Sequence, residues 1–120
     1  LDPSFVAGWN LRDYGDSRVR GFYDFWSMYS PLELASKEKD PLPHFLLVNG
    51  FNDSRVNSAH TFKLYQALRD RPSIQDSWVF LASVNNSGHA CESILSEDYK
   101  GLWTTVVIWS TIFDFFRMKW

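Results

Sequence analysis

Residues 45 to 56 read Phe-Leu-Leu-Val-Asn-Gly-Phe-Asn-Asp-Ser-Arg-Val, and this stretch decides the fold. Its first four residues form a continuous apolar run between Pro43 and Gly50. Such a run predicts a short strand that is buried on both faces, as in a parallel sheet. The polar residues after it predict a tight loop, and this loop presents one carboxylate, Asp53.

A second strand with its own loop follows further along the chain. The apolar residues of the segment 77–83 predict a strand over 78–82, and Asn85-Asn86-Ser87-Gly88-His89 follows it. Sites in such sheets lie beyond the carboxyl ends of the strands, so we expect Asp53 and His89 to lie there together. An acid that orients a histidine base makes up two-thirds of a catalytic triad.

Three segments carry apolar residues at helical spacing. Residues 17–29 predict a first helix, which Ser30-Pro31 ends, and residues 33–43 predict a surface connection. Residues 57–70 predict a second helix, with Asn57 or Ser58 as its N-cap.

The last predicted helix covers residues 99–116 and is interpreted as buried. The order helix, strand, helix, strand, helix is typical of an α/β layered sheet. Its expected apolar face consists of Leu102, Trp103, Val106, Trp109, Phe113 and Phe116.

Length and composition limit the function classes. A chain of 120 residues with 45% hydrophobic and 18% aromatic content has room for one domain with a packed core. A net charge of -2 gives no reason to expect nucleic acid as a partner. The uncharged run 101–113 is shorter than the roughly 20 residues of a bilayer span. The single cysteine, Cys91, allows no internal disulfide and favours a reducing compartment such as the cytoplasm.

Each candidate residue also has a plain structural interpretation. Asp53 is equally placed to pair locally with Arg55, and His89 on its own is an ordinary polar loop histidine. No Gly-x-Ser-x-Gly motif supplies a nucleophile, and Ser17 follows only the first half of one. Cys91 lies close to His89 along the chain and is interpreted as a partly buried thiol.

Other kinds of site find little support in the sequence. The histidines His44, His60 and His89 are scattered without ligand spacing, and no phosphate-binding glycine loop is present, so we expect no metal and no cofactor. Glycosylation patterns begin at Asn52 and Asn85, but both fall in the site loops, and we expect neither to be modified.

Four segments occur in an order that is found in a known family. They are Asp13-Tyr14-Gly15, Tyr29-Ser30-Pro31-Leu32, Leu46 to Val56, and Ser87-Gly88-His89. On these segments the chain resembles the C-terminal part of the catalytic domain of prolyl oligopeptidase-family serine peptidases. The resemblance implies an α/β-hydrolase three-layer sandwich, of which residues 1–120 supply the last two parallel strands with their flanking helices.

The resemblance also implies a role for particular residues. Asp53 corresponds to the triad acid, His89 to the triad base, and Tyr14 to an aromatic beside the pocket for the substrate proline. Trp9 corresponds to the family's proline-stacking tryptophan, although it stands five residues before Tyr14 instead of four. The segment after His89, beginning with Ala90, departs from the small residue, often glycine, that is usual in the family.

The family's nucleophilic serine would lie upstream of Leu1. The implied function is therefore a fragment of a serine peptidase that acts on peptide substrates, partners the remainder of its own catalytic domain, and is inactive alone. Two alternatives stay open. The same fold serves other ester and amide hydrolases, and a chain without a nucleophile is also compatible with a non-catalytic, truncated domain.

Overall fold

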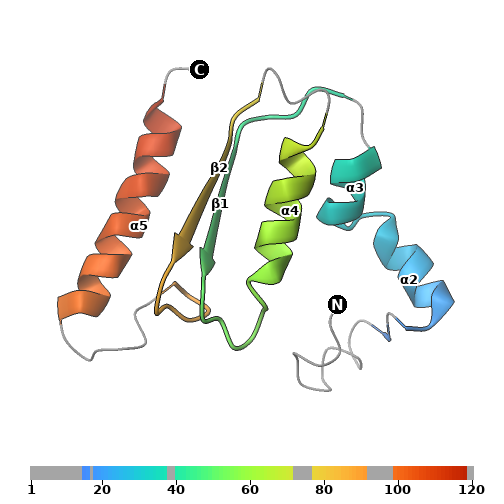
Figure 1. Cartoon of the computed structure of the whole chain (residues 1–120), viewed down its shortest axis with the longest axis horizontal. Coiled ribbons are helices and arrows are strands. Elements are labelled where there is room, and N and C mark those ends of the chain that lie inside the picture. The colour runs from blue at the N-terminus through green and yellow to red at the C-terminus, as the bar shows by residue number, and fades with distance from the viewer. Residues whose placement is uncertain (1–14, 17, 38–39, 72–76, 92–98, 119–120) are drawn as a thin grey trace.

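The two apolar runs form neighbouring strands of one parallel sheet. β1 spans Phe45–Gly50 and β2 spans Val79–Val84. The register pairs Phe45 with Val79 and Gly50 with Val84, so both strands end at the same edge of the sheet. The computed structural model describes residues 15–16, 18–37, 40–71, 77–91 and 99–118 (Figure 1).

Helix α4, Ala59–Arg69, connects the strands and covers one side of the sheet (Figure 1). Its Leu68 is 2% exposed and forms the centre of the small core. Near the start of the helix, the ring of Phe62 lies edge-on to Phe51, with 6.2 Å between ring centroids. This packing holds the loop after β1 against the helix that follows it.

The beginning of α4 distinguishes the two predicted N-caps. The side-chain Oδ1 of Asn57 accepts a hydrogen bond from the backbone N–H of Ala59 at 2.9 Å. Ser58 already has helical backbone angles and makes no side-chain capping bond. Asn57 therefore satisfies one of the free N–H groups of the first turn, and Ser58 does not.

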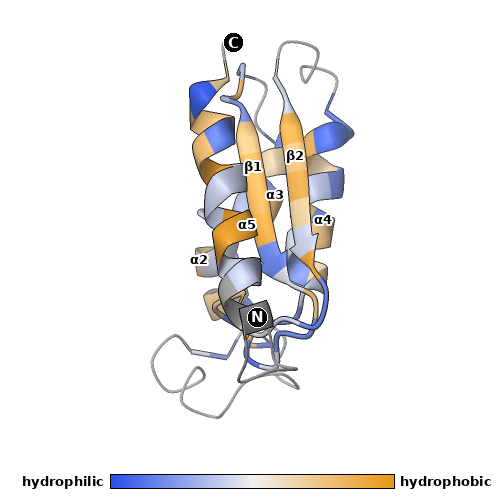
Figure 2. Ribbon diagram, turned by 90° about the vertical axis from the view of Figure 1, so that its left-hand side faces the viewer, coloured by the Kyte–Doolittle hydropathy of each residue, from blue (hydrophilic) through white to orange (hydrophobic). Residues whose placement is uncertain are grey.

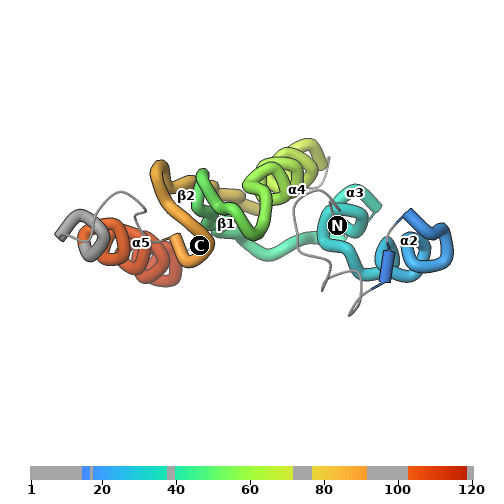
Figure 3. Tube along the Cα trace, turned by 90° about the horizontal axis from the view of Figure 1, so that it is seen from below, coloured from blue at the N-terminus to red at the C-terminus, as the bar shows by residue number. Residues whose placement is uncertain are grey.

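Helix α5, Tyr99–Arg117, lies on the other side of the sheet, so helix, sheet and helix form three layers (Figure 3). The ring of Phe115 meets Phe80 of β2 edge-on at 6.1 Å between centroids. No helix in the described part of the chain has the length and apolar character needed to cross a bilayer.

Within the described part of the chain, α5 is largely exposed, contrary to the prediction of a buried helix. The more protected face carries Ile108, Ile112 and Phe115, which recur every three or four residues and are half-buried. The aromatic content all around the helix explains the error, because periodicity cannot then choose one face. The members of the predicted face whose side chains the structure describes are all exposed: Trp103, Val106, Trp109, Phe113 and Phe116.

Within the described residues before β1, two helices lie where the sequence predicts one helix and a connection. α2 spans Arg20–Ser27, and α3 spans Pro31–Lys37. The prediction of a surface connection from residue 33 onward is therefore wrong as far as Lys37. Pro31 is the first residue of α3, a position to which proline is well suited. Glu33 and Lys37, one turn apart, form an ion pair at 3.4 Å.

The described residues bury little apolar surface. Ala35 and Leu68 are the apolar side chains that are fully buried among them. The strands carry strongly apolar residues (Figure 2), yet Phe45 to Val48 are only half-buried, contrary to the prediction of burial on both faces. Each strand has one edge beside which the described part of the chain places no further strand. Exposed edges and faces of this kind call for cover by other polypeptide.

Candidate active site

Asp53 lies in the loop at the carboxyl end of β1. Its Oδ1 accepts hydrogen bonds from the backbone N–H of Arg55 at 2.7 Å and of Val56 at 2.9 Å. The side chain is 10% exposed. The backbone of the loop therefore holds the carboxylate through Oδ1 and leaves the other oxygen, Oδ2, available to a different partner.

That second oxygen meets His89. Nδ1 of the imidazole lies 2.8 Å from Oδ2 of Asp53, although the two residues are 36 positions apart in the sequence. The register of the sheet explains the meeting, because the loops after β1 and β2 leave the same edge. The sequence-based prediction that this acid and this histidine lie together is borne out by the geometry of the chain.

The electrostatics of the loop favour the charged acid. Burial opposes the ionised form of Asp53. Hydrogen bonds from the Val56 N–H, from His89 and from the Arg55 N–H outweigh that effect and hold the pKa of the carboxyl below its ordinary value. At neutral pH Asp53 is thus ionised and is an acceptor only.

An ionised Asp53 determines how the imidazole works. Nδ1 must carry the proton and donate it to Oδ2, which leaves Nε2 as the basic nitrogen. The His89 side chain is 47% exposed, so the ring is accessible from outside the chain. A histidine held in this way can take a proton from a hydroxyl at Nε2 and return it to a leaving group.

Three further hydrogen bonds tie the two loops together. The N–H of Phe51 donates to the carbonyl of Val84 at 2.9 Å, and that of Asn52 donates to the carbonyl of Ser87 at 3.1 Å. In the opposite direction, the N–H of Asn86 donates to the side-chain Oδ1 of Asn52 at 3.1 Å. The sequence alone does not reveal this role of Asn52, since no local pattern marks a bond between residues 34 positions apart.

Gly50 lets the histidine loop approach the end of β1. A Cβ atom at this position would lie 2.0 Å from the carbonyl oxygen of Gly88 and 2.7 Å from that of Ser87. Both of these neighbours are backbone atoms, which cannot rotate away. The loop that carries His89 can therefore pass over the strand only where the strand has no side chain. A glycine between an apolar run and a polar loop is the sequence signal for such a close approach.

The remaining candidates lie elsewhere or outside the description. Trp9, Tyr14 and Ser17 fall outside the described residues. Cys91 is half-buried, and its N–H donates to the carbonyl of Gly88 at 3.0 Å in the turn that carries His89. In the part of the chain that the structure describes, no three His, Cys, Asp or Glu side chains gather as metal ligands.

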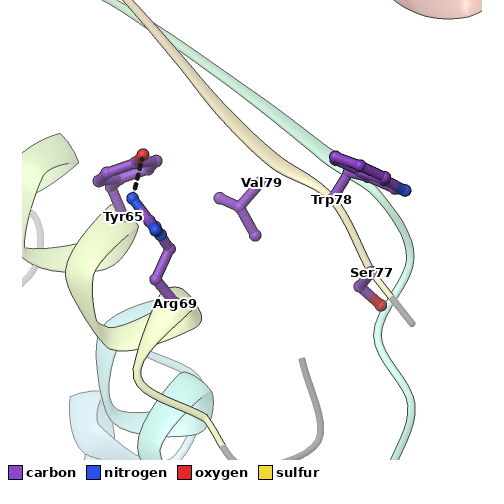
Figure 4. A pocket seen from close by; sticks show the side chains of 5 residues that line it. All are labelled: Tyr65, Arg69, Ser77, Trp78 and Val79. Carbon is purple, nitrogen blue, oxygen red and sulfur yellow. Dashed lines mark hydrogen bonds between the residues drawn. The ribbon is translucent and has the colours of Figure 1, made fainter. Parts of the chain in front are cut away.

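A cavity of about 280 Å³ lies at the opposite end of β2 from the His89 loop. Nη1 of Arg69 donates to the hydroxyl of Tyr65 at 3.0 Å on one wall, and Val79 lies between this pair and Trp78 (Figure 4). Its position at the amino end of the strand separates it from the acid and the histidine. It is lined by Tyr65, Arg69, Ser77, Trp78 and Val79.

Comparison with known protein families identifies the family of this chain. The model of the prolyl oligopeptidase family matches residues 2–109. The chain belongs to this family. The two-stranded parallel sheet between helices is accordingly a fragment of the family's α/β-hydrolase fold.

A curated relative of this prolyl oligopeptidase-family chain is the prolyl endopeptidase of Dictyostelium discoideum. It is 29% identical over 107 residues, which are 88% of this chain and 13% of that protein. The chain thus spans about an eighth of the length of the curated relative it matches. No solved structure matches it.

Proposed function

We propose that this chain supplies the acid and the base of a serine-type peptidase. The observation that carries the proposal is the contact of 2.8 Å between Nδ1 of His89 and Oδ2 of Asp53 at the carboxyl edge of the sheet. Membership of the prolyl oligopeptidase family supports a hydrolase that acts on peptides. The nucleophilic serine and the oxyanion donors belong, in this proposal, to polypeptide that precedes these residues in a longer protein.

The proposed reaction follows from the tautomer that Asp53 imposes. Nε2 of His89 removes the proton from the serine hydroxyl while the oxygen attacks the peptide carbonyl. The imidazolium that forms is stabilised by the ionised Asp53 and then gives its proton to the departing amine. In the second half, the same nitrogen takes a proton from a water that attacks the acyl carbon, and returns this proton to the serine oxygen as the ester bond breaks and the acid product leaves. Asp53 keeps its charge throughout and the histidine is regenerated.

The surface of the chain supports the need for a larger enclosing domain. Trp103, Trp109 and Phe116 of α5 are each more than half exposed. Each strand also has one free edge within the described part. In the proposed whole enzyme, the remainder of the catalytic domain covers these surfaces. The 120-residue chain on its own is then expected to be inactive.

The test uses the longer protein that contains this chain. We expect a serine-directed fluorophosphonate to label it, and His89→Ala to abolish the labelling because the serine is no longer activated. His60→Ala is the matched control, since His60 is an exposed histidine on α4. Undiminished labelling of His89→Ala would refute the proposed role of this pair.

A second candidate keeps the same pair but changes the substrate. Trp9 stands five residues before Tyr14 instead of the family's four, and this departure weakens the case for action after proline and leaves a hydrolase of other esters or amides as the alternative. In the proline-specific version, Trp9 stacks on the proline ring beside Tyr14. The two versions differ in their preference between a proline-containing peptide and a short-chain aryl ester. If Trp9 contacts the substrate proline, replacing Trp9 by alanine should raise KM for the proline-containing peptide and leave KM for the aryl ester unchanged.

A further inference from the structure

We infer that Asn52 is a positioning residue that holds the His89 loop in register with Asp53. This inference rests on the proposed function, in which His89 is the base, and it adds a residue to that site. The observation that carries it is the hydrogen bond of 3.1 Å from the N–H of Asn86 to Oδ1 of Asn52. Asn52 directly precedes the acid, Asp53, and Asn86 lies three residues before the base, His89.

The bond differs in kind from the other links between the loops. The bonds from Phe51 to Val84 and from Asn52 to Ser87 join backbone atoms, so almost any residue can make them. The bond to Oδ1 of Asn52 depends on a side chain that carries an acceptor at the right length. It is therefore the link through which the sequence can control where the second loop lies.

The conformation of the partner supports the same role. Asn86 has a φ of 52°, in the left-handed region that few residues other than glycine and asparagine adopt readily. The chain turns sharply there and passes through the fully buried Ser87 to His89. Because Asn86 is exposed and lies at this sharp turn, a bond that fixes its N–H also fixes the direction in which the chain leaves the turn.

Loss of this bond should act on His89 without unfolding the chain. The two backbone links and the strand register remain in Asn52→Ala, so the loop stays near but is free to shift. The ratio of paired to unpaired His89 should fall about five-fold, which corresponds to one neutral hydrogen bond. Asn52→Asp retains an acceptor oxygen at the same length and should restore the wild-type ratio.

The experiment is NMR spectroscopy, at neutral pH, of the longer protein that contains this chain, with two readouts. The ¹⁵N shifts of the His89 ring report the fraction of the Nδ1–H tautomer, and amide exchange reports the Asn86 N–H. Asn85→Ala is the matched control, because Asn85 is exposed in the same loop and no hydrogen bond of its side chain is recorded in the described part. We expect a loss of Nδ1–H tautomer and of Asn86 protection in Asn52→Ala only.

Several results would overturn the inference. If the Asn86 N–H of the wild-type chain exchanges as fast as in an unstructured peptide, the hydrogen bond to Asn52 does not exist. A wild-type tautomer in Asn52→Ala removes the positioning role, even where Asn86 exchanges faster. If Asn52→Ala fails to fold, Asn52→Asp decides, and loss of the Nδ1–H tautomer in that folded variant refutes the role. Fluorophosphonate labelling that depends on His89 but not on Asn52 would keep the proposed function and discard this inference.

Discussion

Replacing Gly50 by alanine would put a methyl group where the His89 loop crosses the end of β1. The new Cβ would lie 2.0 Å from the carbonyl oxygen of Gly88, whereas ordinary contacts begin at 3.4 Å. The loop must therefore move by about 1.4 Å, or the strand must retreat by the same amount. Neither neighbour is the flexible end of a side chain, so a rotamer change cannot relieve the clash.

The same movement is large compared with the contact between the acid and the base. Nδ1 of His89 lies 2.8 Å from Oδ2 of Asp53, and an added 1.4 Å would give 4.2 Å if the loop moves directly away. A hydrogen bond is already lost at about 3.6 Å. Displacement of a catalytic group by about 1 Å can lower turnover about 10²-fold. We also expect the free energy of unfolding to fall by about 1–3 kcal/mol, as for other overpacked sites.

The assay compares Gly50→Ala with Gly21→Ala. A Cβ at Gly21, on helix α2, has no neighbour within 4 Å, so this variant makes the same chemical change without a clash. In the longer enzyme, peptide hydrolysis should fall about 10²-fold in kcat for Gly50→Ala, and Gly21→Ala should keep full activity. In the same longer enzyme, the Nδ1–H tautomer of His89 should disappear in Gly50→Ala and persist in Gly21→Ala. Wild-type activity and tautomer in Gly50→Ala would refute the steric argument.

Two other predictions concern stability. Asn57→Ala should lower the free energy of unfolding by about 1 kcal/mol, because it removes the side-chain acceptor for the Ala59 N–H, whereas Ser58→Ala should change it little; equal losses in urea unfolding would contradict this assignment of the cap. The folded-state pKa of Asp53 lies below its ordinary value, so this carboxylate stabilises the chain fully above about pH 4, and that contribution is lost as pH falls through the folded-state pKa. The Asp53→Asn variant should be less stable than the wild type above about pH 4, and this difference in unfolding free energy should shrink as the pH falls below about 4. A difference that stays constant down to pH 2 would contradict the coupling between Asp53 ionisation and stability.

The elements that sequence alone predicts well are those with a local signal. The runs Phe45 to Val48 and 78–82 predict β1 and β2, because a short continuous apolar run between turn-forming residues is typical of a strand. The meeting of Asp53 with His89 follows from topology, since parallel strands deliver their loops to one edge. That prediction needs no knowledge of side-chain contacts.

The features that sequence alone misses depend on contacts through space. The first predicted helix does end before Ser30-Pro31, but no local pattern shows that Pro31 also begins a second helix. The protected face of α5 is decided by the sheet and not by the helix, whose aromatic residues point in all directions. The bond from Asn86 to Asn52 and the clearance over Gly50 join positions far apart in the chain, so neither leaves a periodic mark.

The strand register has a consequence for how the site can fail. Asp53 and His89 each follow their strand by a few residues, so their separation is set by how β1 and β2 are aligned. A slip of one residue would slide one loop past the other by about 3.3 Å and turn its strand over. That displacement exceeds the whole length of the bond between acid and base. Substitutions along β1 that shift the strand register would thus break the contact between Asp53 and His89 without touching either loop.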